Sequence, residues 1–313
     1  MIKSGFMPLI DTIVINLLRG AIPENAHELC QDWVSYKHTV ELADSSKGST
    51  MNATSRRILF DSKTIDFFWL FGFSSWLTIE TYCPALEVAC SQGITLESAL
   101  KADEERGQFE MNYKQHLDIT KSLLSVANTS DIEWPEDIPY PTGERDSLNN
   151  VQEKAVFDLV ALALSFSILH EFKHVQARAE EKKYESPQEK DEEELACDTW
   201  AREYITKGVG AYAKNSKHTF EEVMQKRAMG IALAAFTIHA LTPDIEKWGS
   251  GEYPSIAVRI QTMIGGYNLS DSSSFWCFTA CHLIAVMRQE NRKLDYKAST
   301  YKDFVTILLS ELN

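Results

Sequence analysis

Residues 151–181 contain neither glycine nor proline and are apolar on almost every side in the middle of the stretch, VQEKAVFDLVALALSFSILHEFKHVQARAEE. A helix that is apolar all round is stable in water only when other parts of the chain cover it. The stretch therefore predicts a buried helix, and the rest of the chain has to supply the elements that pack around it.

The sequence after this helix remains helical in pattern. A short break contains Pro187 and the acidic run that ends at residue 194. We interpret this run as a solvated loop and the start of the next helix, because acidic side chains are favourable at helix N-termini. Apolar residues then recur at helical spacing, which predicts further helices over residues 193–207, 221–241, 253–264, 274–289 and 301–312.

The first third of the chain is mixed in pattern. Residues 52–61 include a short β-prone run, and residues 64–82 are apolar enough for a buried helix that Pro84 should end. Residues 97–127 predict a charged amphipathic helix. The stretch 131–147, DIEWPEDIPYPTGERDS, is rich in proline, glycine and charge, so it predicts a loop and the best candidate boundary in the chain.

These patterns predict an α+β fold that is mainly α. We expect residues 1–145 to form an N-terminal α/β part with an edge strand near residues 56–60, and residues 146–313 to form a helical part that carries the functional site. A chain of 313 residues, 44% of them hydrophobic, can bury a sizeable core, and we expect one continuous globular unit. An edge strand beside a cleft could present its backbone groups to an extended peptide.

The net charge of -14 argues against nucleic acid as a partner, because an acidic surface repels phosphate groups. Six cysteines are too few for a disulfide framework in a chain of this length, so they predict reduced thiols and a cytoplasmic protein. The interrupted apolar run at the N-terminus, without a clear cleavage site, predicts no signal peptide. The apolar stretches 67–79 and 155–169 are shorter than the roughly 20 residues that span a bilayer. They predict buried core and no membrane contact.

The strongest candidate for a functional site is His170-Glu171-Phe172-Lys173-His174, near the C-terminal end of the buried helix. Residues four apart lie on one face of a helix, so the two imidazoles can bind one ion. Burying them unpaired beside a carboxylate would cost free energy that a zinc ion would offset. A pair of surface histidines beside a solvated acidic run is the alternative interpretation.

A catalytic zinc site usually has three protein ligands and an open position for water. Glu194 and Asp198 are four residues apart on the next predicted helix. If a loop centred on Pro187 lets that helix turn back, Glu194 completes the zinc sphere and Asp198 accepts a proton from a ligand histidine. Glu171, beside the first ligand, is then placed to take a proton from water and pass it to a leaving amine.

Hydrolysis of a peptide bond also requires a donor for the negative charge that develops on the carbonyl oxygen. Candidates in the helical part are Tyr253, Arg259, His239 and Arg227. His239 lies among apolar residues, which is typical of a core histidine, and Arg227 has many acids with which it could pair. We therefore expect Tyr253 and Arg259 to be the catalytic donors.

Six segments, in this order, resemble the family of the phage-exclusion protease Lit, a gluzincin-type metallopeptidase family: IDFFWLFGF, EWPEDIPYP, ILHEFKH, EEELACDTWA, KRAMGIALA and YPSIAVRI. The resemblance implies a zincin-like fold with a small β-containing part. It also implies one Zn2+ per chain, with a general base and an outer carboxylate beside the ligands. In this sequence the ligands are His170, His174 and Glu194, the base is Glu171, and the outer carboxylate is Asp198.

Two positions depart from the pattern of related families. Cys197 precedes Asp198 where alanine is common, and Tyr253 precedes a proline where histidine is common. The spacing of the carboxylates is unchanged, so the expected ligands stand. A tyrosine can still donate a hydrogen bond to an oxyanion.

The resemblance also implies the activity. We expect an intracellular zinc metalloendopeptidase with a specific protein substrate, which could be elongation factor Tu cleaved when a phage-derived peptide activates the enzyme. One alternative is a zinc peptidase that processes a different regulatory protein. Another is a catalytically inactive zinc-binding interaction protein. A purely structural zinc would need a fourth protein ligand, for which Cys197 is a candidate.

Overall fold

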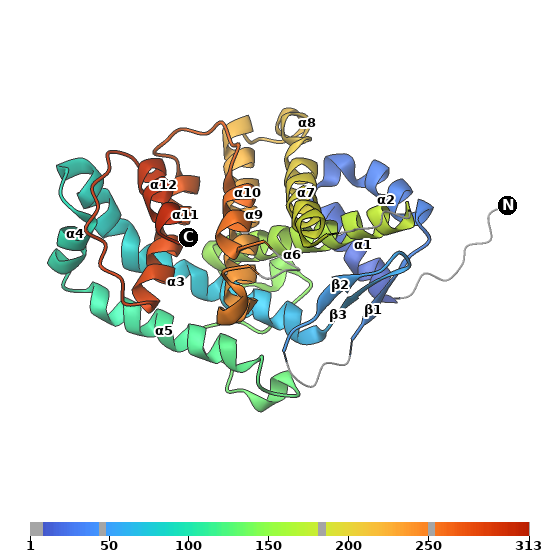
Figure 1. Cartoon of the computed structure of the whole chain (residues 1–313), viewed down its shortest axis with the longest axis horizontal. Coiled ribbons are helices and arrows are strands. Elements are labelled where there is room, and N and C mark those ends of the chain that lie inside the picture. The colour runs from blue at the N-terminus through green and yellow to red at the C-terminus, as the bar shows by residue number, and fades with distance from the viewer. Residues whose placement is uncertain (1–8, 44–47, 181–185, 250–253, 313) are drawn as a thin grey trace.

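The segment that is apolar on every side is α6, a helix over Val151–Ala179 that runs through the middle of the molecule (Figure 1). The computed structural model describes residues 9–43, 48–180, 186–249 and 254–312. Within these residues, α6 is the one helix that could cross a membrane by length and composition, and 78% of its apolar window is buried inside the protein. Other helices pack around α6, as the predicted buried helix requires.

The described part of the chain is mainly helical with one small sheet, which confirms the predicted fold class. In chain order its main elements are α1 (Leu9–Ala21), α2 (Ala26–Ser35), β1 (Thr39–Leu42), β2 (Met51–Ala53), β3 (Arg57–Phe60), α3 (Ser62–Gln92), α4 (Leu96–Ala102), α5 (Arg106–Ser122), α6, α7 (Pro187–Thr206), α8 (Val209–Asn215), α9 (Phe220–Leu241), α10 (Ile256–Ile264), α11 (Ser274–Gln289) and α12 (Tyr301–Glu311). The helices expected after α6 are all present.

Pro187 is the first residue of α7 rather than the centre of a loop, so this helix begins earlier than the predicted residue 193. The side chain of Ser186 caps the helix by accepting a hydrogen bond from the backbone N–H of Glu189. Proline is favourable directly after such a cap, because the first helical residue needs no N–H donor. The acidic run therefore lies within the first turns of α7.

α3 continues through Pro84, so the expected stop at this proline was wrong. A proline inside a helix removes one backbone hydrogen bond and costs about 3 kcal/mol. Beyond it, Leu86 and Ala89 are fully buried, and α3 packs against both α5 and α11. This burial outweighs the cost of the proline. The helix ends instead at Gly93, whose φ of 62° is in the left-handed region that glycine adopts most easily.

The charged stretch that was expected to form one helix is divided into α4 and α5. Asp103 lies at the break, where its Oδ1 accepts a hydrogen bond of 3.1 Å from the backbone N–H of Arg106. Such local side-chain bonds compete with the hydrogen bonds of a continuous helix. The loop predicted over 131–147 is present between α5 and α6 and contains only short 3-10 turns.

The sheet has three strands in the order β1-β3-β2, with β1 parallel and β2 antiparallel to β3. The strand predicted near residues 56–60 is β3, but it is the central strand, so its expected position at the edge was wrong. Ile58 and Phe60, two residues apart on β3, lie on one face of the sheet and are buried, whereas Arg57 is exposed. β2 is the edge strand that contacts α6.

Residues on both sides of the 131–147 loop belong to one hydrophobic core. α3 precedes the loop, yet it packs against α6, α9 and α11, which follow it. Within the loop, the backbone oxygen of Pro139 accepts a hydrogen bond of 2.7 Å from Nε1 of Trp69. The division near residue 145 remains a prediction, and the core that joins the two parts is continuous.

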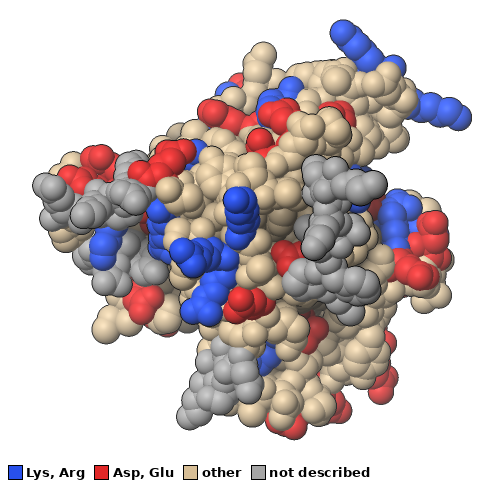
Figure 2. All heavy atoms as spheres, turned by 90° about the vertical axis from the view of Figure 1, so that its right-hand side faces the viewer, with Lys and Arg blue, Asp and Glu red and all other residues tan. Residues whose placement is uncertain are grey.

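Charges of both signs lie on the face that carries α2 and the sheet. Figure 2 shows a group of lysine and arginine side chains on this face, with acidic side chains around it. The surplus of acidic residues in the sequence therefore does not produce a uniformly acidic surface here.

Replacing Gly230 with alanine is expected to destabilise the protein by about 1–3 kcal/mol. α9 packs against α6 at this glycine, where an added Cβ atom would lie 2.4 Å from the Cβ atom of Leu162. The free energy of unfolding in urea measures the effect. Gly107→Ala in α5 is the control, because a Cβ atom there meets nothing within 4 Å and should leave stability unchanged or slightly higher. Equal effects of the two substitutions would contradict close packing at Gly230.

Candidate metal centre

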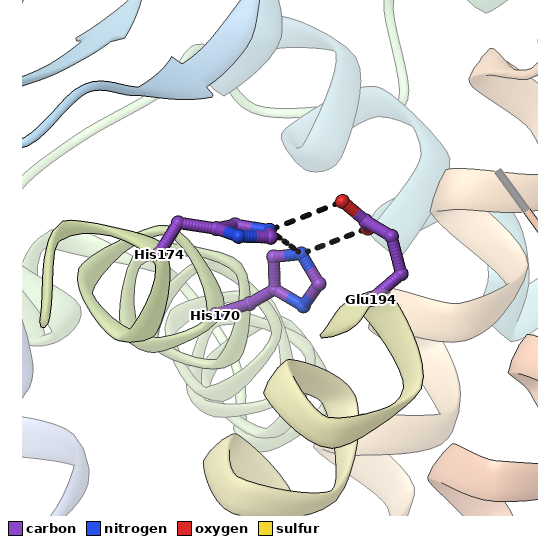
Figure 3. A group of neighbouring side chains, drawn as sticks. All are labelled: His170, His174 and Glu194. Atoms are coloured by element: carbon purple, nitrogen blue, oxygen red, sulfur yellow. Dashed lines mark hydrogen bonds and ion pairs between the residues drawn. The ribbon is translucent and has the colours of Figure 1, made fainter. Parts of the chain in front are cut away.

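His170 and His174 lie one turn apart on α6, and their side chains point to the same side of the helix (Figure 3). Both are buried, with exposed fractions of 6% and 4%. Their Nε2 atoms are 3.1 Å apart. The four-residue spacing thus brings two ring nitrogens together inside the protein.

Glu194 reaches the same point from α7 (Figure 3). Its Oε2 atom lies 3.3 Å from Nε2 of His170, and its Oε1 atom lies 3.1 Å from Nε2 of His174. α7 packs against α6 through a buried face that includes Cys197 and Ala201. The structure therefore brings together the three residues that the sequence suggested as metal ligands.

The three ligand atoms fit a metal ion. Ligands about 2.0–2.1 Å from a tetrahedral zinc lie about 3.3–3.4 Å from one another, and the distances here are 3.1–3.3 Å. Nδ1 of each histidine lies within 3.0 Å of a carboxylate oxygen, which favours a proton on Nδ1 and makes Nε2 the nitrogen that would bind a metal. Two Nε2 atoms at this distance require positive charge on the rings or between them. His170, His174 and Glu194 could therefore hold a metal ion.

The carboxylates around the two histidines favour positive charge on or between the rings. Burial alone would lower the pKa of His170, but Asp198 and Glu194 raise it to about 10. Burial alone would also lower the pKa of His174, but neighbouring side chains raise it to about 12. Burial would raise the pKa of Glu194, whereas the two histidines lower it well below its ordinary range. The site thus has the charge distribution that a bound cation needs.

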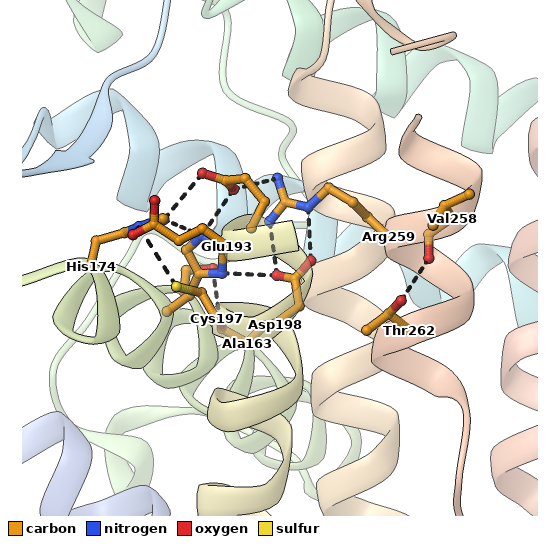
Figure 4. A network of polar contacts seen from close by, with 11 residues as sticks. Ala163, His174, Glu193, Cys197, Asp198, Val258, Arg259 and Thr262 are labelled. Atoms are coloured by element: carbon orange, nitrogen blue, oxygen red, sulfur yellow. Dashed lines mark hydrogen bonds and ion pairs between the residues drawn. The ribbon is translucent and has the colours of Figure 1, made fainter. Parts of the chain in front are cut away.

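Asp198 and Arg259 form a buried ion pair (Figure 4), and Asp198 also contacts His170. Oδ1 of Asp198 is 2.8 Å from Nδ1 of His170, although the ring N–H is not aligned for a hydrogen bond. Nε and Nη2 of Arg259 donate hydrogen bonds of 2.8 Å to the two oxygens of Asp198, and its Nη1 lies 3.6 Å from Glu194. Burial would raise the pKa of Asp198, but Arg259 and His170 hold it below its ordinary value. Arg259 therefore contacts the carboxylates of Asp198 and Glu194, which in turn contact the histidines.

Glu193 and Cys197 contact the other histidine, and the sequence analysis missed Glu193 (Figure 4). Oε1 of Glu193 is 3.0 Å from Nδ1 of His174, and Sγ of Cys197 is 3.6 Å from the same atom. The run that contains Glu193 was interpreted as solvated. However, Glu193, Cys197 and Ala201 recur every four residues on the buried face of α7. That spacing distinguishes Glu193 from its exposed neighbour Glu192.

Glu171 follows His170 on α6 and is 9% exposed. Burial raises the pKa of its carboxyl group, while the charges of His170, His174 and Arg259 act in the opposite direction, and the net result is a raised pKa. A carboxylate of raised pKa accepts a proton from water more readily and can still release it to an amine. These properties suit a general base.

The remaining candidates from the sequence lie elsewhere. Tyr253 is outside the described residues. His239 lines a cavity between α3, α5, α9 and α11, beside Lys121. Arg227 pairs with Glu24, with Nη2 and Oε2 2.9 Å apart, so it is engaged in a buried ion pair between α9 and the N-terminal region.

Three other buried histidines should make the protein less stable in acid. Burial lowers the pKa of His38 and His282 to about 4, and that of His239 to about 3. In the unfolded chain each histidine binds a proton near pH 6.5, so between pH 6.5 and about 4 the unfolded state binds more protons than the folded state. Their stabilisation is complete above pH 6.5 and is lost as the pH falls through that window.

Each of these histidines is expected to lower the free energy of unfolding by about 1–2 kcal/mol between pH 7 and pH 5. Urea denaturation at both pH values, with a chelator present so that metal release does not contribute, measures the change. His282→Gln should reduce the pH dependence, whereas His218→Gln, at an exposed position, should not. An unchanged pH dependence in His282→Gln would contradict the prediction.

The family model of Peptidase U49 matches residues 58–279, from β3 to the first turns of α11, and so includes all three candidate ligands. With the fold and the site described above, this match makes the protein a peptidase, a hydrolase that acts on protein substrates. In particular, the chain belongs to the Peptidase U49 family, the family of the Lit protease. The match confirms the resemblance seen in the sequence. Searches of curated proteins and of solved structures gave no match.

Proposed function

We propose that the protein is a zinc-dependent endopeptidase in which His170, His174 and Glu194 bind one Zn2+ per chain. The observation that carries the proposal is the convergence of two Nε2 atoms and a carboxylate, 3.1–3.3 Å apart, inside a peptidase. Imidazole and carboxylate ligands suit zinc, and three protein ligands leave a position for water.

Glu171 is the proposed general base. Zinc bound at this site would make a water molecule more acidic and polarise the carbonyl group of the scissile bond. Glu171 takes the proton from this water as the new C–O bond forms, and gives it to the leaving amine as the C–N bond breaks. The reaction needs no covalent bond between the substrate and the chain.

Asp198 and Arg259 are proposed to position the first histidine. Asp198 contacts Nδ1 of His170, which leaves Nε2 for the metal, and Arg259 neutralises Asp198 in the interior. Nε and Nη2 of Arg259 each donate one hydrogen bond to Asp198, and Nη1 lies 3.6 Å from Glu194, so all three nitrogens face carboxylates. The contacts of Arg259 thus favour a positioning role. Tyr253 remains a proposed oxyanion donor.

β2 is the proposed edge for an extended substrate. In an antiparallel pair, alternate residues direct their backbone groups toward the partner strand and away from it. The backbone N–H of Thr54 donates to the oxygen of Arg57 on β3, so Met51 and Ala53, at odd-numbered positions, direct theirs away from β3. Because β2 also contacts α6, a peptide added to this edge would lie beside the helix of the metal ligands.

The proposed substrate rests on the membership of this family. We propose a cytoplasmic enzyme that cleaves one specific protein, with elongation factor Tu as the first candidate and a phage-derived peptide as the candidate activator. The alternatives are a peptidase for a different regulatory protein and an inactive zinc-binding protein. In a catalytically inactive protein, substitution of Glu171 would have no effect on function.

The test combines metal content with hydrolysis. Elemental analysis of the purified protein should find one zinc per chain, and cleavage of elongation factor Tu should stop with a chelator and return with zinc. Each assay is run with and without proteins from phage-infected cells, because an activator is part of the proposal. Cleavage that persists in metal-free protein would contradict the zinc mechanism. A zinc-loaded protein that cleaves no substrate in either condition would favour the inactive binding protein.

A further inference from the structure

We infer that Glu193 is a positioning residue of this peptidase, which holds His174 so that Nε2 faces the metal position. The inference rests on the proposed function, because it assigns one more residue to the same site. Its basis is the contact of 3.0 Å between Oε1 of Glu193 and Nδ1 of His174, two buried atoms from different helices.

Glu193 and Glu194 hold the two nitrogens of one ring. Glu193 lies 3.0 Å from Nδ1 of His174, and Glu194 lies 3.1 Å from Nε2 of the same ring. His170 has the same arrangement, with Asp198 at Nδ1 and Glu194 at Nε2. α7 therefore supplies the candidate ligand and an outer carboxylate for each histidine. Such outer carboxylates fix the tautomer and orientation of a metal-binding imidazole and make it a stronger ligand.

The burial of Glu193 supports a role in the site rather than at the surface. It is 7% exposed, whereas Glu192, directly before it in the acidic run, is exposed. A buried carboxylate costs several kcal/mol unless charged or hydrogen-bonding groups compensate it. The N–H group of His174 is such a partner, and positive charge transferred to this ring from a bound metal would strengthen the contact.

Cys197 is the competing partner for the same nitrogen. Its Sγ atom lies 3.6 Å from Nδ1 of His174, farther than the carboxylate oxygen of Glu193. A thiol is a weak acceptor, whereas a bond to a carboxylate is charge-assisted. We therefore assign the positioning role to Glu193, with Cys197 filling the space beside it.

The experiment compares Glu193→Gln with Glu192→Gln and Cys197→Ala in the full chain. The dissociation constant for zinc is measured by competition with a chromogenic chelator, and the visible spectrum is measured after substitution with Co2+. Glu193→Gln should raise the dissociation constant about 10–100-fold and shift the cobalt bands. Glu192→Gln and Cys197→Ala should change the dissociation constant less than about threefold, well below the effect of losing an outer carboxylate.

Unfolding of the metal-free and zinc-loaded proteins separates positioning from a general structural role. If Glu193 acts through His174, zinc raises the free energy of unfolding of Glu193→Gln by less than it raises that of wild type, and the zinc-loaded variant loses kcat with KM unchanged. Equal zinc affinity in Glu193→Gln and Glu192→Gln, or a larger loss in Cys197→Ala, would overturn the inference while the zinc site stands. Wild type that binds no zinc would overturn the proposed function and this inference together.

Discussion

Glu171→Gln is expected to lower kcat by about 10²–10⁴-fold, the usual contribution of a general acid–base group, while the protein still binds one zinc per chain. Glutamine has almost the same size as glutamate but cannot take a proton from water at neutral pH. Because Glu171 is only 9% exposed, an isosteric change is needed to keep the packing of α6 intact. The measurement is the initial rate of cleavage of elongation factor Tu, the proposed substrate, together with the zinc content of each sample.

Glu180→Gln is the control for this substitution, since it makes the same chemical change at an exposed position just past the end of α6. It should leave both the rate and the zinc content unchanged. A Glu171→Gln variant that retains wild-type kcat would remove Glu171 from the mechanism. A variant that loses zinc along with activity would instead assign Glu171 to the metal ligands or to the folding of the site.

Glu194→Ala is expected to remove zinc and, with it, all activity. Only two ligands would remain, and the loss of zinc affinity should exceed the roughly 10–100-fold that loss of an outer carboxylate causes. The substitution also removes the partner of Nη1 of Arg259, 3.6 Å away. Zinc content after dialysis and the dissociation constant in solution measure the effect, and Glu194→Gln repeats the test with the side-chain volume retained.

The control for Glu194 is Glu192→Ala, an exposed position on the same helix, which should keep zinc at wild-type affinity. If Glu194→Ala and Glu194→Gln both keep zinc at full occupancy and unchanged affinity, the third ligand is misassigned. The group of His174, Glu193 and Cys197, whose ligand atoms lie within 4.8 Å of one another, would then be the next candidate set.

Whereas α1, α2 and α8 were not predicted, local patterns in the sequence predicted α6 and most of the helices after it, because their apolar residues recur at helical spacing. The same is true of His170 and His174, whose relation depends only on one turn of α6. The central position of β3 could not be predicted in this way, because β1 and β2 are short and strand order depends on pairing between separate segments. The expected helix end at Pro84 was wrong for a similar reason, because tertiary packing buries the part of α3 beyond the proline.

Within the site, contacts between residues far apart in the sequence were harder to predict than contacts within one helix. Glu194 and Asp198 could be assigned because their spacing matches that of the histidines. Arg259 was expected near the reacting groups, but its bidentate contact with Asp198, 61 residues earlier, had no local signal. Glu193 was the opposite case: its signal was local, in the buried face of α7, and the acidic run concealed it.

The placement of the candidate ligands on consecutive helices has a consequence for how the protein folds. His170, His174, Glu193, Glu194 and Asp198 all lie within one short span of the chain, on α6 and α7. Closing a short loop costs little chain entropy, and contacts between neighbouring segments form early. If the proposed zinc site is correct, the ion can bind once these two helices meet, before α10 brings in Arg259. The metal would then act as a nucleus for the folding of the enzyme as well as a part of its chemistry.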